Sequence, residues 1–259
     1  NGLLDGFGIF DYSDGSKYIG NYKSGKTNGQ GFWSMANGTI FIGIFKNDLM
    51  EGDGIISYKS GMKFIGKLRQ GIPLQGTLLM PDGSRYVGEL KEGNKMWNGQ
   101  MFIEDHPYIP KYTDGKESIV PKQEVKLFRW TTSSGFIWKS FGNMSDWSYF
   151  GQVSNGAPNG QGTLALPDGS AYRGGIKDGD LHGVGEMTAN EGGISFKTAG
   201  QFKFGKANGQ HIGTYMNGSI LVGEMRDDQP WEAMFLDVDH NILNRWTNGI
   251  KEIILEDMY

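Results

Sequence analysis

The stretch that decides the fold, residues 18–38, reads YIGNYKSGKTNGQGFWSMANG. It opens with an aromatic-x-Gly triplet, continues with three spaced glycines and ends in an Asn-Gly pair. Further triplets follow at steps of 22 or 23 residues, and the series resumes after a gap. The triplets are Tyr18-Ile19-Gly20, Phe41-Ile42-Gly43, Phe64-Ile65-Gly66, Tyr86-Val87-Gly88, Tyr149-Phe150-Gly151 and Tyr172-Arg173-Gly174, with weaker copies at Thr198-Ala199-Gly200 and Leu221-Val222-Gly223. Self-similarity at a fixed period of this length indicates a repeat architecture.

A turn dipeptide ends three residues before most of these triplets. These dipeptides are Asp14-Gly15, Asn37-Gly38, Ser60-Gly61, Asp82-Gly83, Asp168-Gly169 and Asn217-Gly218. Asn-Gly and Asp-Gly between alternating apolar residues favour a two-residue type I′ turn, because both central residues of that turn need a positive φ. The flanking stretches show no helical period of apolar residues. We therefore expect each repeat to be a β-hairpin without a helix.

The glycines inside the predicted strands need a reason, because each costs roughly 0.5–1 kcal/mol relative to alanine. A two-residue turn at Asn37-Gly38 places Phe32 opposite Gly43, where a ring can lie over bare backbone. The aromatic residue and the glycine of a triplet share one face of their strand. We predict that these pairs form the structural repeat: Tyr18 and Gly20, Phe41 and Gly43, Phe64 and Gly66, Tyr86 and Gly88, Tyr149 and Gly151, Tyr172 and Gly174.

This pattern resembles the MORN (membrane occupation and recognition nexus) repeat. The resemblance rests on Tyr18, Gly20, Tyr22, Gly25, Gly29 and Gly31, and again on Tyr172, Gly174, Gly179, Gly183 and Gly185. It implies an all-β fold, an elongated single-layer twisted sheet of successive β-hairpins forming a MORN-repeat solenoid in two blocks. The sequence departs from the pattern at Leu74, Trp97, Thr198, Leu221 and His211, where we expect distorted repeats.

The repeats divide the chain into four segments. We expect a first MORN-repeat block at 1–103, a non-repeat insertion with a hairpin at 104–148, a second block at 149–233 and a C-terminal cap at 234–259. The insertion hairpin is expected to pair Val125–Trp130 with Phe136–Phe141. In the cap, Ile250, Ile253, Ile254 and Met258 have near-helical spacing, whereas 252–255 can equally form a strand. Gly2, Gly6 and Gly8 repeat the spacing of later glycines, so the chain is expected to open within a repeat.

Composition argues against several functional classes. The net charge is −4 and there is no cysteine, so a nucleic-acid role is disfavoured and thiolate chemistry is excluded. We predict no catalytic residue, no cofactor site and no metal site. The run Asp237-Val238-Asp239-His240-Asn241 has alternating oxygen ligands as in a calcium loop, but it lacks the remainder of that loop and favours a turn. His182 and His211 are expected to be solvated loop residues.

The sequence also predicts an apolar surface for binding. Apolar residues on the face opposite the aromatic-glycine row are expected to form a groove for a helix or peptide of a partner protein, or a homodimer seam. The groove residues are Trp33, Met35, Ile42, Ile44, Ile56, Tyr58, Ile65, Leu78, Val87, Phe150 and Leu164. The alternative is that the curvature of the repeats, the insertion at 104–148 and the C-terminal tail cover this face.

These features favour a non-enzymatic scaffold that binds a partner protein or its own copy. The resemblance implies scaffolding in the cytoplasm or at a membrane–cytoskeleton junction. It also leaves open a phospholipid-binding module, although the acidic balance argues against one, and a regulatory module of a larger enzyme.

Overall fold

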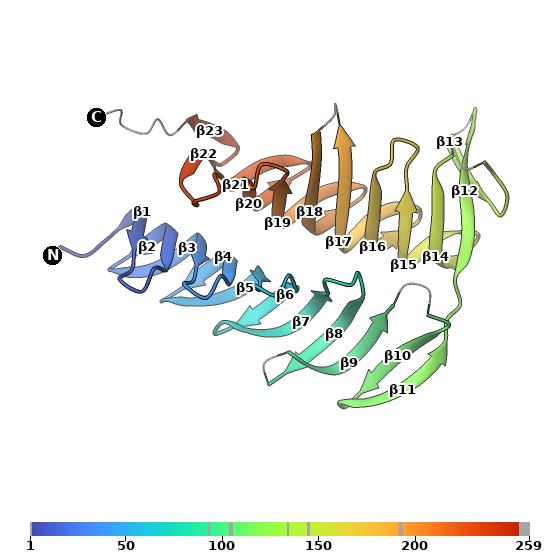
Figure 1. The fold of residues 1–259 in the computed structure, drawn as a ribbon, viewed down its shortest axis with the longest axis horizontal. Helices are drawn as coiled ribbons and strands as arrows, with labels where there is room; N and C mark the ends of the chain where they lie inside the picture. Colours follow the sequence, from blue (N-terminus) through green and yellow to red (C-terminus); the bar gives the residue numbers. More distant parts are fainter. Residues whose placement is uncertain are drawn as a thin grey trace. The chain divides into compact units, whose positions relative to one another are not determined.

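The computed structural model describes residues 2–92, 94–103, 106–133, 135–143, 146–191 and 194–253. All regular structure in these ranges is β-strand, and no residue in them is helical. The strands form two antiparallel sheets in which hairpins follow one another along the chain (Figure 1). The predicted all-β fold of successive hairpins in two blocks is therefore confirmed.

The first sheet runs in the order β1 to β11 without a crossover. Its strands are β1 (Gly6–Asp11), β2 (Lys17–Lys23), β3 (Lys26–Ser34), β4 (Ile40–Lys46), β5 (Leu49–Ser57), β6 (Lys63–Arg69), β7 (Ile72–Leu79), β8 (Arg85–Lys91), β9 (Lys95–Phe102), β10 (Tyr108–Thr113) and β11 (Lys116–Pro121). Successive strands are hydrogen-bonded neighbours, so each new hairpin extends the same sheet.

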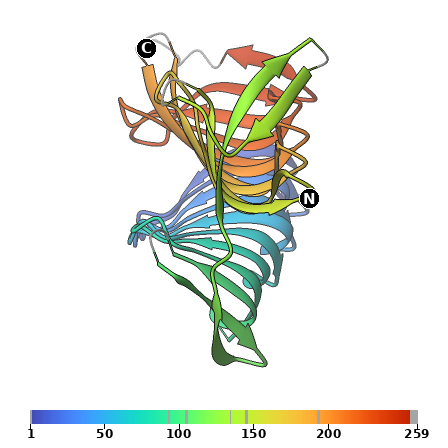
Figure 2. The same cartoon turned by 90° about the vertical axis from the view of Figure 1, so that its right-hand side faces the viewer.

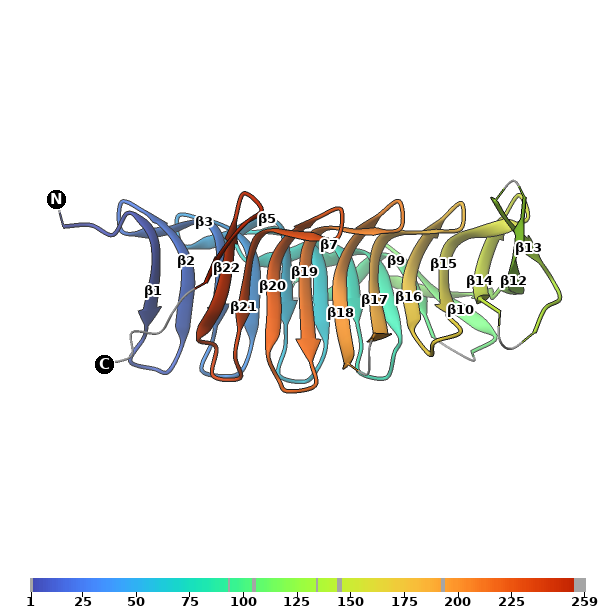
Figure 3. The same cartoon turned by 90° about the horizontal axis from the view of Figure 1, so that it is seen from above.

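The second sheet runs in the order β13, β12 and then β14 to β23. Its strands are β12 (Val125–Thr132), β13 (Gly135–Lys139), β14 (Ser148–Ser154), β15 (Ala157–Ala165), β16 (Ala171–Lys177), β17 (Asp180–Glu191), β18 (Ile194–Lys203), β19 (Lys206–Tyr215), β20 (Ile220–Arg226), β21 (Gln229–Leu236), β22 (Ile242–Thr247) and β23 (Ile250–Ile253). Figure 3 shows the hairpin turns of this sheet following one another along each side, from β15 to β22.

The chain divides into two compact units. One unit comprises Asn1–Lys122 with Val222–Glu224, and the other Gln123–Leu221 with Met225–Tyr259. The predicted insertion at 104–148 supplies β10 and β11 to the first sheet and β12 and β13 to the second. The hairpin expected within it is present as β12 paired with β13. In the predicted cap, 250–253 is a strand rather than the start of a helix, and Ile254 and Met258 lie outside the described residues.

The turn type predicted at the Asn-Gly and Asp-Gly pairs is wrong. At the hairpin after β3, the amide of Met35 donates to the carbonyl of Thr39, and the amide of Gly38 donates back to the carbonyl of Met35. This is a three-residue loop in which Gly38 alone has a positive φ, of 82°. The two-residue type I′ turns lie at the opposite ends of the strands, as at Ser24-Gly25 with φ of 52° and 79°.

The register of both sheets brings the repeat glycines into line. In the first sheet the glycines paired across consecutive strands are Gly8, Gly20, Gly31, Gly43, Gly54, Gly66, Gly76, Gly88 and Gly99. In the second sheet the aligned residues are Gly151, Gly162, Gly174, Gly185, Gly200 and His211. Each sheet therefore carries a glycine row, a line of bare backbone that crosses its strands.

The tyrosine rings of the repeats lie against this glycine row. A Cβ atom added to Gly185 would overlap the ring of Tyr172, and one added to Gly99 would lie 2.6 Å from the hydroxyl of Tyr86. Each ring therefore covers the glycine of its own triplet and the glycine paired with it. The predicted packing of Phe32 on Gly43 is wrong, because Phe32 pairs with Ile42.

A β-bulge follows the glycine in several repeats, and the tyrosine hydroxyl compensates for it. The register shifts between Gly174 and Ile176, and the hydroxyl of Tyr172 donates to the carbonyl of Gly175 at 2.9 Å. Equivalent bonds run from Tyr18 to Asn21, from Tyr86 to Glu89 and from Tyr149 to Gln152, at 3.2, 2.8 and 2.6 Å. The tyrosine thus satisfies a backbone carbonyl at the irregular residue of the strand.

The rings gather on one side of each sheet. We call the side of the first sheet that carries Tyr18, Trp33, Phe41, Phe64 and Tyr86 its aromatic face; cross-strand pairing places these residues together. Buried residues of this face form one cluster, and Tyr149, Leu164 and Tyr172 belong to the corresponding cluster of the second sheet. Figure 2 shows the strands of each sheet as arcs rather than straight ribbons.

Candidate partner-binding site

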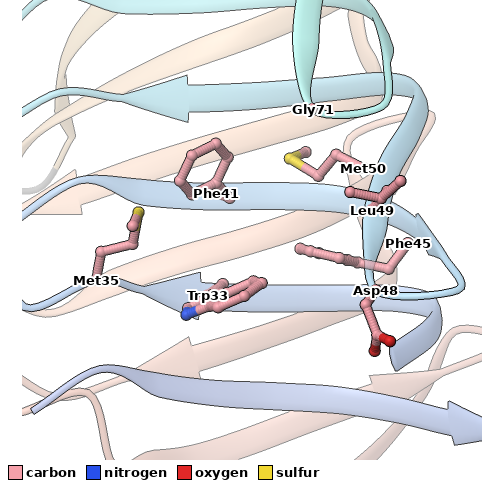
Figure 4. Close-up of a pocket in the computed structure, with 8 residues that line it drawn as sticks. All are labelled: Trp33, Met35, Phe41, Phe45, Asp48, Leu49, Met50 and Gly71. Atoms are coloured by element: carbon pink, nitrogen blue, oxygen red, sulfur yellow. The ribbon is translucent and has the colours of Figure 1, made fainter. Parts of the chain in front are cut away.

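An apolar pocket of about 250 Å³ opens on the aromatic face of the first unit. Figure 4 shows the side chains that line it, gathered over β3, β4 and β5. The lining residues are Trp33, Met35, Phe41, Phe45, Asp48, Leu49, Met50 and Gly71. Only Asp48 among them carries a charge, so the walls are suited to apolar side chains.

The pocket lies where one repeat departs from the tyrosine arrangement. A Cβ atom added to Gly54 would lie 2.5 Å from the methyl group of Met50, which occupies the place that a tyrosine ring takes in other repeats. Phe41, the aromatic residue of this triplet, is only partly buried and lines the pocket instead. Phe45 packs edge-on against Tyr18, with ring centroids 5.2 Å apart. One wall of the pocket is therefore continuous with the core of the aromatic face.

The rim of the pocket is exposed. Leu49 is 45% exposed, and Ile72, which follows the lining residue Gly71 at the start of β7, is 50% exposed. Asp48 lies in the turn between β4 and β5, where its carboxylate accepts a hydrogen bond from the amide of Thr27 at 2.8 Å. Burial, followed by the charges of Tyr12 and Asp48, raises the pKa of Tyr22 to about 12. The phenol of Tyr22 is therefore neutral at pH 7. Among the residues that line the pocket, Asp48 is the acidic one.

Cross-strand pairing corrects the face predicted for the groove. Trp33, Met35, Ile56, Tyr58 and Leu78 lie on the aromatic face, not opposite it, since Trp33 pairs with Phe41 and Leu78 with Phe64. Of these five, only Trp33 and Met35 line the pocket.

The remaining groove residues lie elsewhere. Ile42, Ile44, Ile65 and Val87 lie on the reverse side of the first sheet, where Ile42 and Ile65 are fully buried and Ile44 is 39% exposed. Leu164 is buried on the aromatic face of the second sheet, and Phe150 is 41% exposed on its reverse side. The predicted set is therefore not one surface.

Sequence reasoning missed Phe45, Asp48, Leu49, Met50 and Gly71 as pocket residues. One signal was available, because Asn47-Asp48 is a two-residue turn without glycine. The other residues are ordinary strand and turn positions whose meeting depends on the register.

The first unit also gathers basic side chains that are scattered along the sequence. The residues that flank its turns at one end of the strands, of two residues or, between β8 and β9, of three, include Lys23, Lys26, Lys46, Arg69, Lys91, Lys95 and Lys116, all of them exposed. We call this set the basic edge. The acidic residues in the same turns are Asp48, Glu92 and Asp114, so positive charge predominates along the edge.

His211 is buried rather than solvated, which contradicts its prediction as a loop histidine. It is 3% exposed and lies in the glycine row opposite Gly200. Its Nε2 is 2.6 Å from the carbonyl oxygen of Gln201, and its Nδ1 is 3.3 Å from the hydroxyl of Thr198. Burial lowers the pKa of this imidazole, so the ring is neutral at pH 7. Its role is structural.

The described residues do not gather metal-binding side chains. Within them, no group of three or more His, Asp or Glu side chains could hold a metal ion, and no helix is long and apolar enough to cross a membrane. Asp237 accepts hydrogen bonds from the amides of Asp239 and Asn241, at 2.9 and 2.8 Å. This pattern is that of a turn closed by an aspartate side chain.

Comparison with known families identifies the repeat. A family profile described as MORN repeat matches residues 1–17, 18–40, 41–63, 149–171 and 172–194. The chain therefore contains five MORN repeats. The matched segments supply strands to both sheets, and the altered repeats at Thr198 and Leu221 lie beyond them.

Curated relatives resemble part of the chain. Alsin of Rattus norvegicus is 29% identical over 116 residues, which make up 44% of this chain and 7% of that protein. Alsin of Homo sapiens is 30% identical over 122 residues, or 46% of this chain and 7% of that protein. The chain thus spans about 7% of the length of these relatives.

Two solved structures were also matched. One is the SAS-4 (dCPAP) TCP domain in complex with a proline-rich motif of Ana2 (dSTIL) of Drosophila melanogaster, at 10% identity and a TM-score of 0.22, covering 96% of this chain and 90% of that one. The other is the G-box domain of the microcephaly protein CPAP, at 12% identity and a TM-score of 0.21, covering 85% of this chain and 100% of that one. Both TM-scores are low, so neither match bears on function here.

Proposed function

We propose that this chain is a non-enzymatic scaffold that binds a partner protein through the aromatic face of its first unit. The observation that carries the proposal is the apolar pocket lined by Trp33, Phe41 and the exposed side chain of Leu49. Ile72, which is also exposed, follows the lining residue Gly71 in the chain. Exposed apolar residues next to a preformed apolar pocket are typical of protein-interaction sites. MORN repeats commonly mediate protein or membrane-lipid interactions, which agrees with this reading.

The chemistry of the pocket defines the part of the partner that binds. A pocket of about 250 Å³ accommodates one or two apolar side chains, such as those that an amphipathic helix presents at successive turns. The basic edge lies at the turn end of the same strands, beside Leu49 and Ile72. A partner helix with apolar anchors and acidic flanks complements both features.

Photo-crosslinking tests this proposal. A benzophenone amino acid at position 49 should crosslink a defined apolar segment of one partner, which mass spectrometry of the crosslinked peptide identifies. Leu49→Asp and Ile72→Asp should abolish recovery of that partner. Ile119→Asp should not, because Ile119 is 63% exposed on β11, away from the pocket. Since all three side chains are exposed, the variants should remain folded, and equal recovery with all of them would refute the site.

The same experiment shows whether the partner is a second copy of this chain or a different protein. Crosslinks between copies in the purified protein, with a dimer mass in light scattering that Leu49→Asp reduces to a monomer mass, would indicate a homodimer. A monomer mass at all concentrations would exclude it.

Anionic phospholipid is a second candidate, favoured by the basic edge. Clustered Lys and Arg side chains beside exposed apolar residues can bind an anionic membrane surface. Replacement of Lys23, Lys46 and Arg69 by glutamine should then remove flotation with phosphatidylserine vesicles at low salt. Absence of flotation by the unaltered protein would leave the protein partner as the function of this face.

A further inference from the structure

One cross-strand pair in the second sheet lacks the two large side chains that the equivalent pairs of other repeats carry. Thr198 on β18 pairs with Gly213 on β19. The corresponding pairs in six other repeats are Tyr18 with Trp33, Phe41 with Ile56, Phe64 with Leu78, Tyr86 with Met101, Tyr149 with Leu164 and Tyr172 with Met187. Each of those pairs sets an aromatic ring beside a second large apolar side chain, whereas this pair offers a hydroxyl and a hydrogen atom.

The missing side chains leave a pocket of about 430 Å³. His211 replaces only part of the lost volume, because its ring covers Gly200 in the glycine row. The pocket is lined by Thr198 and Gly213 together with Met187, Phe196, Phe202 and Tyr215. A Cβ atom added to Gly213 would have its nearest neighbours at 3.7 and 3.8 Å, in Leu221, so this position has room for a side chain.

The pocket walls are aromatic and its mouth carries a hydrogen-bond acceptor. Phe202 packs edge-on against His211, with centroids 5.0 Å apart, and Phe196 stacks on Tyr215 at 5.7 Å. The exposed carboxylate of Asp228 also lines the pocket, and it accepts a hydrogen bond from the amide of Ala207 at 2.7 Å. Aromatic walls favour another aromatic ring, and a carboxylate favours a ligand with an N–H or O–H donor and disfavours an anion.

We infer that this pocket binds a tryptophan side chain presented by a partner peptide. The indole ring takes the place of the large apolar side chain that Gly213 lacks, with the rings of Phe202 and Tyr215 among the residues around it. Its N–H can donate to the exposed carboxylate of Asp228, which also lines the pocket. The pocket belongs to the second unit, so this inference does not depend on partner binding at the first unit.

Titration of the full chain with N-acetyl-tryptophanamide tests the inference. Saturable chemical-shift changes are expected at the methyl groups of Met187 and Met225, which line the pocket. Gly213→Met restores the large side chain that Met187 supplies in the preceding repeat, so it should abolish these changes while raising the melting temperature. Leu164→Met is the matched control, because it replaces the same repeat position in an intact pair and should leave binding unchanged.

A second variant tests the acceptor without refilling the pocket. Asn at position 228 can still accept from the amide of Ala207, so Asp228→Asn should fold normally. It should weaken binding of N-acetyl-tryptophanamide and permit binding of benzoate, which the unaltered protein should exclude. The inference fails if the unaltered protein shows no saturable shift, or if a folded Gly213→Met variant binds as the unaltered protein does. Equal binding of benzoate before and after Asp228→Asn would refute the role of the carboxylate.

Discussion

The imidazole Nε2 of His211 lies 2.6 Å from the carbonyl oxygen of Gln201. In the preceding repeat the hydroxyl of Tyr172 donates to the equivalent carbonyl, that of Gly175, at 2.9 Å. The two rings reach this carbonyl from different strands, because Tyr172 precedes its carbonyl by three residues and His211 comes from the paired strand. Two departures from the repeat, a threonine for the aromatic and a histidine for the glycine, therefore compensate each other.

We expect Thr198 and His211 to be strongly coupled. His211→Gly should cost about 3 kcal/mol, because it leaves a cavity and an unsatisfied carbonyl. Thr198→Tyr alone should also destabilise, since the new ring would collide with His211. The double variant restores the tyrosine–glycine arrangement and should be more stable than the sum of the single changes by more than about 1.5 kcal/mol. Urea denaturation of the four proteins measures this coupling, and additive changes would contradict it.

The stability of the protein should fall on mild acidification because of His211. Burial places the pKa of this histidine in the folded state below its ordinary value of 6.5. As the pH falls below 6.5, the unfolded chain gains a proton at this residue before the folded chain does, so the free energy of unfolding decreases.

Denaturation midpoints at pH 7.5 and at about pH 5.5 should therefore differ more in the unaltered protein than in the Thr198→Tyr, His211→Gly double variant. Asp14 and Asp82 do not obscure this window. Hydrogen bonds from Ser16 and Ser84 lower the pKa of these carboxyls below their usual 3.8. The stability that these two carboxylates contribute to the protein is therefore lost only at more acidic pH. The same pH dependence in both proteins would show that His211 does not titrate as described.

The tyrosine hydroxyl should contribute measurably to stability. Tyr172→Phe keeps the ring over the glycine row but removes the bond to the carbonyl of Gly175, so we expect a loss of about 1–2 kcal/mol. Tyr108 is 47% exposed, and Tyr108→Phe serves as the control with an expected change within about 0.5 kcal/mol. Equal effects of the two substitutions in chemical denaturation would show that the buried bond is not significant.

The repeat, its strands and its hairpins could be predicted from spacing and turn dipeptides alone. The face of the groove could not, because it depends on the length of one turn. A two-residue loop at Asn37-Gly38 would pair Phe32 with Gly43, whereas the three-residue loop pairs Phe32 with Ile42. A shift of one residue exchanges the two faces of a strand. Trp33 was therefore expected on the wrong side of the sheet.

The pocket itself depends on side-chain packing that no local pattern encodes. Phe41 matches the repeat as well as Tyr18 does, yet the methyl group of Met50 takes its place over the glycine row. The departures at Thr198 and His211 left a clearer signal in the sequence. They occur 13 residues apart, which is also the spacing between the aromatic residue of a repeat and the second glycine that its ring covers, as in Tyr172 and Gly185. The departures were visible in the sequence, but their compensation required the register.

A comparison of two substitutions in the glycine rows tests the central claim most directly, namely that the repeat rings lie on bare backbone. Neither Gly185 nor Gly8 has a left-handed backbone; a Cβ atom at Gly185 would overlap the ring of Tyr172, whereas one at Gly8 would lie 3.5 Å from the ring of Tyr22. In chemical denaturation, Gly185→Ala should cost more than about 2 kcal/mol, and Gly8→Ala should be neutral or stabilising by up to about 1 kcal/mol. Equal effects of the two substitutions on the free energy of unfolding would contradict the account.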